Sequence, residues 1–118
     1  MLDLLIKLYK EDDFSVRERL IDHTVQMIGV EETLNAIHIF EMLEEQETDD
    51  YQKFHYHIAI LSLARQTYNP QLFEKTMLKR QPDPSGASIL EIAEVYLASG
   101  ESNIALEWME KIPEGDIF

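Results

Sequence analysis

The sequence of 118 residues contains no cysteine, and glycine and proline occur only four times each. The lack of cysteine excludes disulfides and zinc sites built on thiolates. No apolar run approaches the ~20 residues that a helix needs to cross a bilayer. The start at Met1-Leu2-Asp3 lacks the basic residues and the cleavage site of a secretion signal. From these absences we expect a cytoplasmic protein that does not enter a membrane.

Basic residues are also scarce, with 10 Lys and Arg against 23 Asp and Glu and a formal net charge of −13. A field of that sign repels phosphate backbones and anionic lipid surfaces, so we expect neither nucleic acid nor membrane as a partner. The charge fits either an acidic surface that keeps the protein soluble or recognition of a basic protein or peptide. The hydrophobic fraction of 45% argues against disorder.

Apolar residues recur at helical spacing along the chain, and no strand-like alternation is sustained. We therefore expect an all-α domain of about seven helices that pack as an array of antiparallel α-α hairpins. The expected helix boundaries are capping boxes opened by Ser15 and Ser88, a left-handed stop at Gly29, an N-cap at Asn69 and a stop at Pro113. Ser102 or Asn103 is expected to cap the last helix.

The expected third helix carries a stripe of apolar side chains that should face the core: Leu34, Ile37, Phe40 and Leu43. Residues 44–50 should form a flexible acidic loop, because the spacing and glycine of a calcium-binding EF-hand loop are missing. The fourth helix, about residues 51–68, is apolar on most sides and is predicted to be central and buried. Trp108 on the last helix is expected to pack against the preceding hairpin.

A shift of 34 residues aligns two predicted hairpins within residues 51–113, and small alanines recur in both. In the last hairpin, the spacing of Ala93, Tyr96, Gly100 and Ala105 resembles the tetratricopeptide repeat family. This resemblance implies a right-handed solenoid, in which each hairpin buries its apolar face against its neighbours. We therefore expect one α-helical domain over residues 1–118, with a divergent helical part at 1–50 and two tetratricopeptide-like hairpins at 51–113.

Three longer segments resemble a family of uncharacterised bacterial helical-repeat proteins: DDFSVRERLID, LARQTYNPQLFEKTM and ALEWMEKIPEG. That family is longer than this chain and has no assigned activity. The sequence ends on Ile117-Phe118 without the polar cap that normally closes a solenoid. The resemblance and the apolar end both favour a segment of a larger protein, or a C-terminal helix that docks on something, a second copy included.

No constellation of residues indicates catalysis, a cofactor or a metal. The four histidines lie on different helices or, as with His55 and His57, two residues apart on one helix, where side chains diverge. His38 and Glu41 are three apart but lack the further ligands that a zinc site needs. The glycines are isolated, so no phosphate-cradling loop exists. We therefore expect a protein that is not an enzyme and has no cofactor.

Three functions fit these observations. The first is a protein-interaction module, whose concave surface would hold the partner. The second is an acidic inhibitor or immunity protein that mimics the charge of nucleic acid. The third is a structural segment of a larger helical-repeat protein. Mapped through the tetratricopeptide resemblance, the candidate partner-binding residues are Lys53, Tyr56, His57, Glu91 and Glu94.

Overall fold

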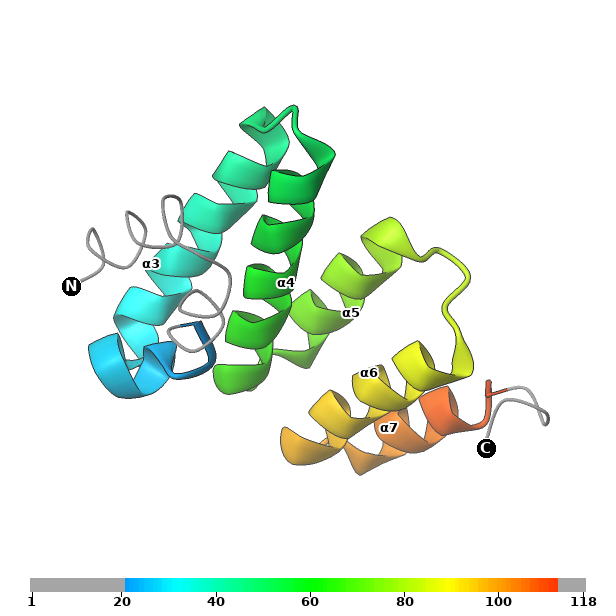
Figure 1. The fold of residues 1–118 in the computed structure, drawn as a ribbon. Coiled ribbons are helices and arrows are strands. Elements are labelled where there is room, and N and C mark those ends of the chain that lie inside the picture. The colour runs from blue at the N-terminus through cyan, green and yellow to red at the C-terminus, as the bar shows by residue number, and fades with distance from the viewer. Residues whose placement is uncertain (1–20, 113–118) are drawn as a thin grey trace. The chain divides into compact units, whose positions relative to one another are not determined.

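The computed structural model describes residues 21–112 of the chain, and this part contains five α-helices and no strand (Figure 1). The all-α expectation is therefore confirmed for these residues, and the expected total of about seven helices refers to the whole chain. The expected first helix, the capping box at Ser15 and the stop at Pro113 lie outside the described residues. The helices are α3 (Thr24–Gln46), α4 (Asp50–Gln66), α5 (Pro70–Arg80), α6 (Gly86–Ala98) and α7 (Ser102–Met109).

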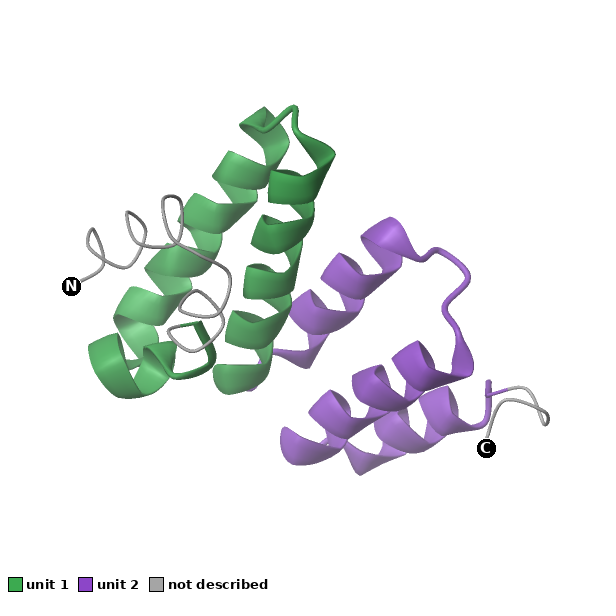
Figure 2. Ribbon diagram, in the orientation of Figure 1, with its two compact units in different colours: residues 1–67 green, residues 68–118 purple. Residues whose placement is uncertain are grey.

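The chain divides into two compact units, residues 1–67 and residues 68–118 (Figure 2). The described part of the first unit holds α3 and α4, and that of the second holds α5, α6 and α7. The first of the two hairpins expected from the repeat, α4 with α5, therefore has one helix in each unit. The second, α6 with α7, lies within a single unit.

In the first unit, α3 and α4 lie side by side and antiparallel, joined by residues 47–49 (Figure 1). The acidic loop is shorter than the expected 44–50, because α3 continues to Gln46. Glu47 and Asp49 order the connection locally. A Glu47 side-chain oxygen accepts from the Thr48 and Asp49 amides at 3.2 and 3.1 Å. Asp49 then caps α4 by accepting from the amide of Gln52 at 3.3 Å.

The buried stripe of α3 is rotated from the expected one. Ile37 and Phe40 are buried as expected, but Leu34 is 41% exposed and Thr33 takes the inward position. The hydroxyl of Thr33 donates to the carbonyl of Gly29 at 2.6 Å, so its burial leaves no hydroxyl unsatisfied. One face of α3 therefore lies against α4, and it carries Thr33, Ile37, Phe40 and the buried Glu44.

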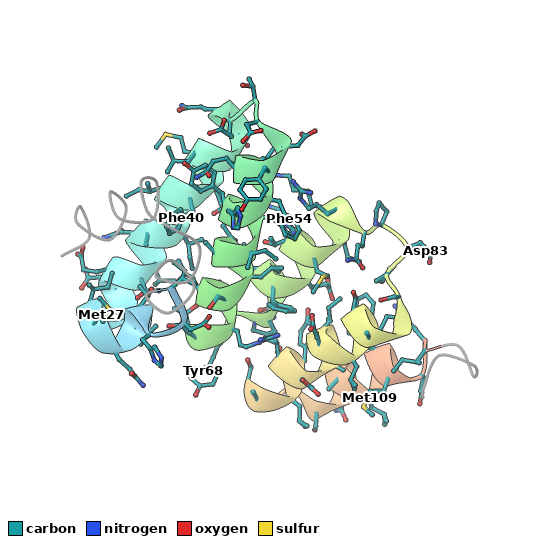
Figure 3. All side chains as sticks on the ribbon, in the orientation of Figure 1. Met27, Phe40, Phe54, Tyr68, Asp83 and Met109 are labelled. Carbon is teal, nitrogen blue, oxygen red and sulfur yellow. The ribbon has the colours of Figure 1, made fainter. Side chains whose placement is uncertain are left out.

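The opposing helix α4 is buried over most of its circumference, which confirms the predicted burial of this helix. The small Ala59 and Ala64 are completely buried and allow a close approach of other helices. The ring of Tyr56 lies 6.0 Å from that of Phe40, centroid to centroid. Figure 3 shows Phe40 on the side of α3 that faces α4. Two apolar residues of this run, Phe54 and Ile58, depart from the expected burial and are exposed.

The end of α4 is tied to the start of α3 by the side-chain amide of Gln66. This amide donates to the carbonyl of Ile21 at 2.6 Å and accepts from the amide of Val25 at 3.1 Å. Ser62, one turn earlier, donates to the carboxylate of Asp22 at 2.9 Å. Gln66 therefore satisfies backbone groups where regular helix geometry is interrupted.

Gly29 interrupts α3, and its backbone angles are φ 84° and ψ 170°. The positive φ agrees with the expectation of a glycine-dependent stop. The value of ψ, however, places the residue in an extended region that is essentially restricted to glycine, rather than in the left-handed helical region. Two helical segments consequently meet at Gly29 and continue as one element.

We expect Gly29→Ala to lower the free energy of unfolding by about 1–3 kcal/mol. A β-carbon at this position would meet nothing within 4 Å, so the cost comes from backbone strain alone. Urea unfolding followed by circular dichroism measures the change. The control is Asn35→Ala at an exposed position of the same helix, which should change stability by less than about 0.5 kcal/mol. Equal stability of the two variants would contradict the prediction.

In the second unit, Asn69 caps α5 as expected. Its side-chain oxygen accepts from the amide of Leu72 at 3.3 Å, and Pro70 occupies the first turn. The expected cap of α6 at Ser88 is wrong, because Ser85 fills that position and accepts from the amide of Ser88 at 3.3 Å. Helix α6 thus begins at Gly86, directly after the linker of residues 81–85 and earlier than the capping box at Ser88 indicated.

The turn between α6 and α7 is closed by backbone hydrogen bonds around Gly100, whose φ is 86°. The amide of Gly100 donates to the carbonyl of Leu97 at 3.1 Å, and that of Glu101 donates to the carbonyl of Tyr96 at 2.9 Å. This pair of bonds is a Schellman motif, which favours glycine at the left-handed position. Helix α7 begins directly after it, with Glu101 as N-cap, so the expected caps at Ser102 or Asn103 are wrong.

The core of the second unit is small and apolar. Its most buried apolar and aromatic side chains are Phe73, Met77, Ile89, Ile92, Ala93, Val95, Tyr96 and Ala105. Within residues 21–112, no helix combines the length and the apolar character that crossing a bilayer requires.

Candidate functional site

An open groove with a volume of about 480 Å³ runs along α6 and α7. We call it the α6–α7 groove. It lies within the second unit and collects side chains from both helices. Its lining residues are Leu90, Ala93, Glu94, Leu97, Ser102, Asn103, Ala105, Leu106 and Met109.

The groove follows from the distribution of large and small apolar residues on the two helices. Ala93 and Ala105 are buried and too small to fill the space above them. Larger side chains stand on either side, and Leu97 and Leu106 are 59% and 56% exposed. Met109 lies on α7 near its end (Figure 3). A contiguous apolar surface of this kind is typical of a site that another molecule covers.

The groove is bordered by negative charge. Residues 86–110 contain five glutamates and no lysine or arginine. Glu94 lines the groove itself, and Glu91, one turn away on α6, is exposed. On α7, Glu107 and Glu110 are exposed and are also one turn apart. Both helices therefore carry a pair of exposed carboxylates, and three of the four directly follow an apolar lining residue in the sequence.

The five residues expected to contact a partner do not share one surface. Tyr56 and His57 are only 2% and 3% exposed, so the expectation that they present an accessible face must be corrected. Their burial follows from α4 being enclosed on most sides. Lys53 is half-buried in the first unit, whereas Glu91 and Glu94 are exposed in the second. Only Glu94 lines the α6–α7 groove.

In the first unit, His57 belongs to a buried polar pair. Its Nδ1 lies 3.7 Å from Oε2 of Glu44, and both side chains are almost completely buried. Sequence reasoning had placed Glu44 in an exposed loop. The pair joins α3 to α4 in the core and is a structural contact. Within the described residues, no three His, Asp or Glu side chains are grouped so that they could hold a metal ion.

The second unit has a polar cluster centred on Glu74 of α5. Oε1 of Glu74 accepts a hydrogen bond from the hydroxyl of Tyr96 on α6 at 3.1 Å and from the indole of Trp108 on α7 at 2.9 Å. Nζ of Lys111 lies 4.3 Å from the centre of the Trp108 ring. One carboxylate thus links three helices, and the half-buried Trp108 reaches the helix that precedes its own hairpin.

Burial raises the pKa of the Tyr96 hydroxyl from 10.0 to about 12, and the hydrogen bond and negative charge of Glu74 add to the effect, as does the charge of Glu101. Tyr96 is therefore a neutral donor over the whole physiological pH range. Its role is to position α6 against α5, and with it one wall of the α6–α7 groove.

A smaller cavity of about 280 Å³ lies near the 81–85 linker. Asp83, which Figure 3 labels in this linker, and Lys111 are its charged lining residues. Trp108 also lines it, with Lys111 already over its ring. The cavity is smaller than the α6–α7 groove, and among the described residues no group of His, Asp and Glu side chains at it could hold a metal ion.

Sequence reasoning missed the α6–α7 groove, although one signal was present. Helix α6 carries apolar residues around most of its circumference, interrupted mainly by Glu91 and Glu94. Such a helix needs cover on most sides, and α5 and α7 leave the side of Leu90 and Leu97 uncovered.

Comparison of the chain with protein families, with curated proteins and with solved structures finds no match. The fold defines an all-α protein within the described residues. The resemblance to tetratricopeptide repeats stays a prediction. Any function proposed for the chain therefore rests on its own geometry and charge.

We expect Glu74→Ala to lower the free energy of unfolding by about 1–3 kcal/mol, because the buried hydroxyl of Tyr96 and the half-buried indole of Trp108 lose a charged acceptor. Trp108 is the only tryptophan, so its fluorescence reports this contact directly, and its emission should shift to longer wavelength. Lys75→Ala, at the next and exposed position of α5, is the control and should leave both stability and emission unchanged. Matching emission spectra for the two variants would show that Glu74 does not hold the indole.

The raised pKa of Tyr96 predicts a loss of stability at alkaline pH. Between about pH 10 and about pH 12 the folded chain keeps the proton of Tyr96 while the unfolded chain releases it. The folded state then binds more protons, so the free energy of unfolding falls as the pH rises through this window. Urea unfolding at about pH 9, 10 and 11 should show a steeper loss for the wild type than for Tyr96→Phe. Tyr68→Phe, at an exposed position, should behave as the wild type, and parallel curves for all three proteins would refute the assignment.

Proposed function

We propose that this chain is a non-enzymatic protein-interaction module whose binding site is the α6–α7 groove. The occupant is an amphipathic helix of another protein. The observation that carries the proposal is the exposure of four large apolar side chains along one open groove: Leu90, Leu97, Leu106 and Met109.

The shape of the groove suits a helix. Two antiparallel helices joined by a short turn leave a furrow between them, and a third helix packs into such a furrow at an interaxial distance of about 8–10 Å. Leu90 and Leu97 are seven residues apart on α6 and therefore lie along one line of the helix surface. A partner helix with apolar anchors at i, i+3 or i+4, and i+7 matches this spacing.

The tetratricopeptide resemblance supports the same geometry. In a solenoid, each hairpin is covered by the next, and the uncovered face of the last hairpin is where a further helix would stack. The partner helix would take that place. The competing occupant is a following hairpin of a longer protein. If such a hairpin covers the groove, no separate helix should bind there.

Replacing Leu97 and Leu106 together by Gln should weaken binding of an amphipathic helix at least tenfold, because two leucines lose an apolar contact worth about 1–3 kcal/mol each. The probe is a fluorescein-labelled, helix-stapled peptide of 18 residues with leucines at i, i+3, i+4 and i+7. Fluorescence anisotropy measures its dissociation constant.

The matched control is Leu34→Gln with Met42→Gln, two exposed apolar positions on α3 that do not line the groove. Both double variants should keep the circular dichroism and the unfolding midpoint of the wild type, since all four side chains are exposed. Binding that survives Leu97→Gln with Leu106→Gln, or no binding to the wild type at all, would overturn the proposed function.

A further inference from the structure

The borders of the α6–α7 groove carry charge of one sign only. Glu94 on α6 lines the groove, and three further exposed glutamates directly follow lining residues in the sequence: Glu91 follows Leu90, Glu107 follows Leu106 and Glu110 follows Met109. Among the described residues, none of these four carboxylates forms an ion pair within the chain. They are therefore available to charges that a partner brings.

The positive charges of the second unit lie elsewhere. Lys75, Lys79 and Arg80 belong to α5, and the latter two stand in its last turn, where they complement the helix dipole. Lys111 follows α7 and lies over the ring of Trp108. No lysine or arginine occurs between residues 86 and 110 to offset the glutamates of the groove.

We infer that the helix that occupies the α6–α7 groove is basic, with an apolar stripe flanked on both sides by lysine or arginine. This inference rests on the proposed function and specifies its partner. The leucines of the groove contact the stripe, while Glu91 and Glu94 face one basic flank and Glu107 and Glu110 face the other.

Charge decides which helices bind more than it decides how tightly they bind. An exposed ion pair changes affinity by a factor of about 1.5–5, so four pairs together raise the affinity for a basic helix by at least about fivefold. An acidic helix meets like charges on both flanks and is rejected. Because these carboxylates are exposed, added salt screens both effects.

The same reasoning disfavours a second copy of this chain as the occupant. A two-fold symmetric dimer formed by pairing the grooves would bring Glu91 and Glu94 of one copy near the carboxylates of the other. The repulsion would oppose burial of the leucines. A partner of opposite charge gains both the burial of the leucines and an electrostatic attraction.

The experiment compares three labelled, stapled peptides that share one leucine pattern and differ at four flanking positions, which are Lys, Gln or Glu. At about 50 mM salt, the full-length wild type should bind the Lys peptide at least about fivefold more tightly than the Gln peptide, and it should bind the Glu peptide least. Raising the salt to about 500 mM should compress the three affinities toward one value.

Two variants of equal net charge locate the effect. The test variant combines Glu91→Gln, Glu94→Gln, Glu107→Gln and Glu110→Gln and should lose the ranking of the peptides. The control variant removes four exposed charges on α3 and α4 of the first unit and should keep the ranking. Its substitutions are Glu31→Gln, Glu32→Gln, Glu45→Gln and Asp50→Asn.

Each other outcome overturns a defined statement. Equal binding of all three peptides refutes the basic partner but leaves the helix-binding groove in place. Loss of the ranking in both variants shows that net charge, and not the groove border, selects the peptide. No binding of any peptide refutes the proposed function itself. Dimerisation of the wild type in sedimentation, abolished by Leu97→Gln with Leu106→Gln, identifies a second copy as the occupant instead.

Discussion

The packing of α7 onto α6 determines the properties of the second unit. Ala93 and Ala105 are small enough to bring the two helices close, and the Schellman turn at Gly100 reverses the chain within a few residues. Glu74 then accepts hydrogen bonds from both helices. With α7 held in this position, Leu97 and Leu106 stand on opposite walls of an open groove. A different angle of α7 would close that space or flatten it.

The groove combines two kinds of surface that seldom coexist without a partner. Its walls are apolar, while its borders are acidic and lack any basic residue within residues 86–110. The apolar walls favour binding of a molecule that buries them. The negative borders disfavour a second copy of this chain in that role, because its own carboxylates would be repelled. The net charge of −13 therefore affects which partners this groove can bind, in addition to its general effect on solubility.

Much of the local structure was predictable from sequence. The helical character of the described residues, the cap of α5 at Asn69, the positive φ of Gly29 and the buried position of α4 all follow from residue type and spacing. Helix faces were less predictable. Thr33 faces inward in place of Leu34, because a threonine that bonds to the preceding turn is compatible with burial. Glu44 is likewise buried beside His57, a pairing that spacing could not show because the two residues lie on different helices.

The sequence by itself determined the all-α class, most helix positions and the acidic character, because these depend on local propensity, periodicity and composition. Only the tertiary structure decided which apolar residues are covered. Leu97 and Leu106 are exposed although they are large and apolar, whereas Tyr56 and His57, which the sequence suggests as partner-binding residues, are buried. Burial depends on which helices pack together, and that choice is set by contacts between residues far apart in the chain. For this reason the α6–α7 groove, unlike the helices that form it, emerged only from the fold.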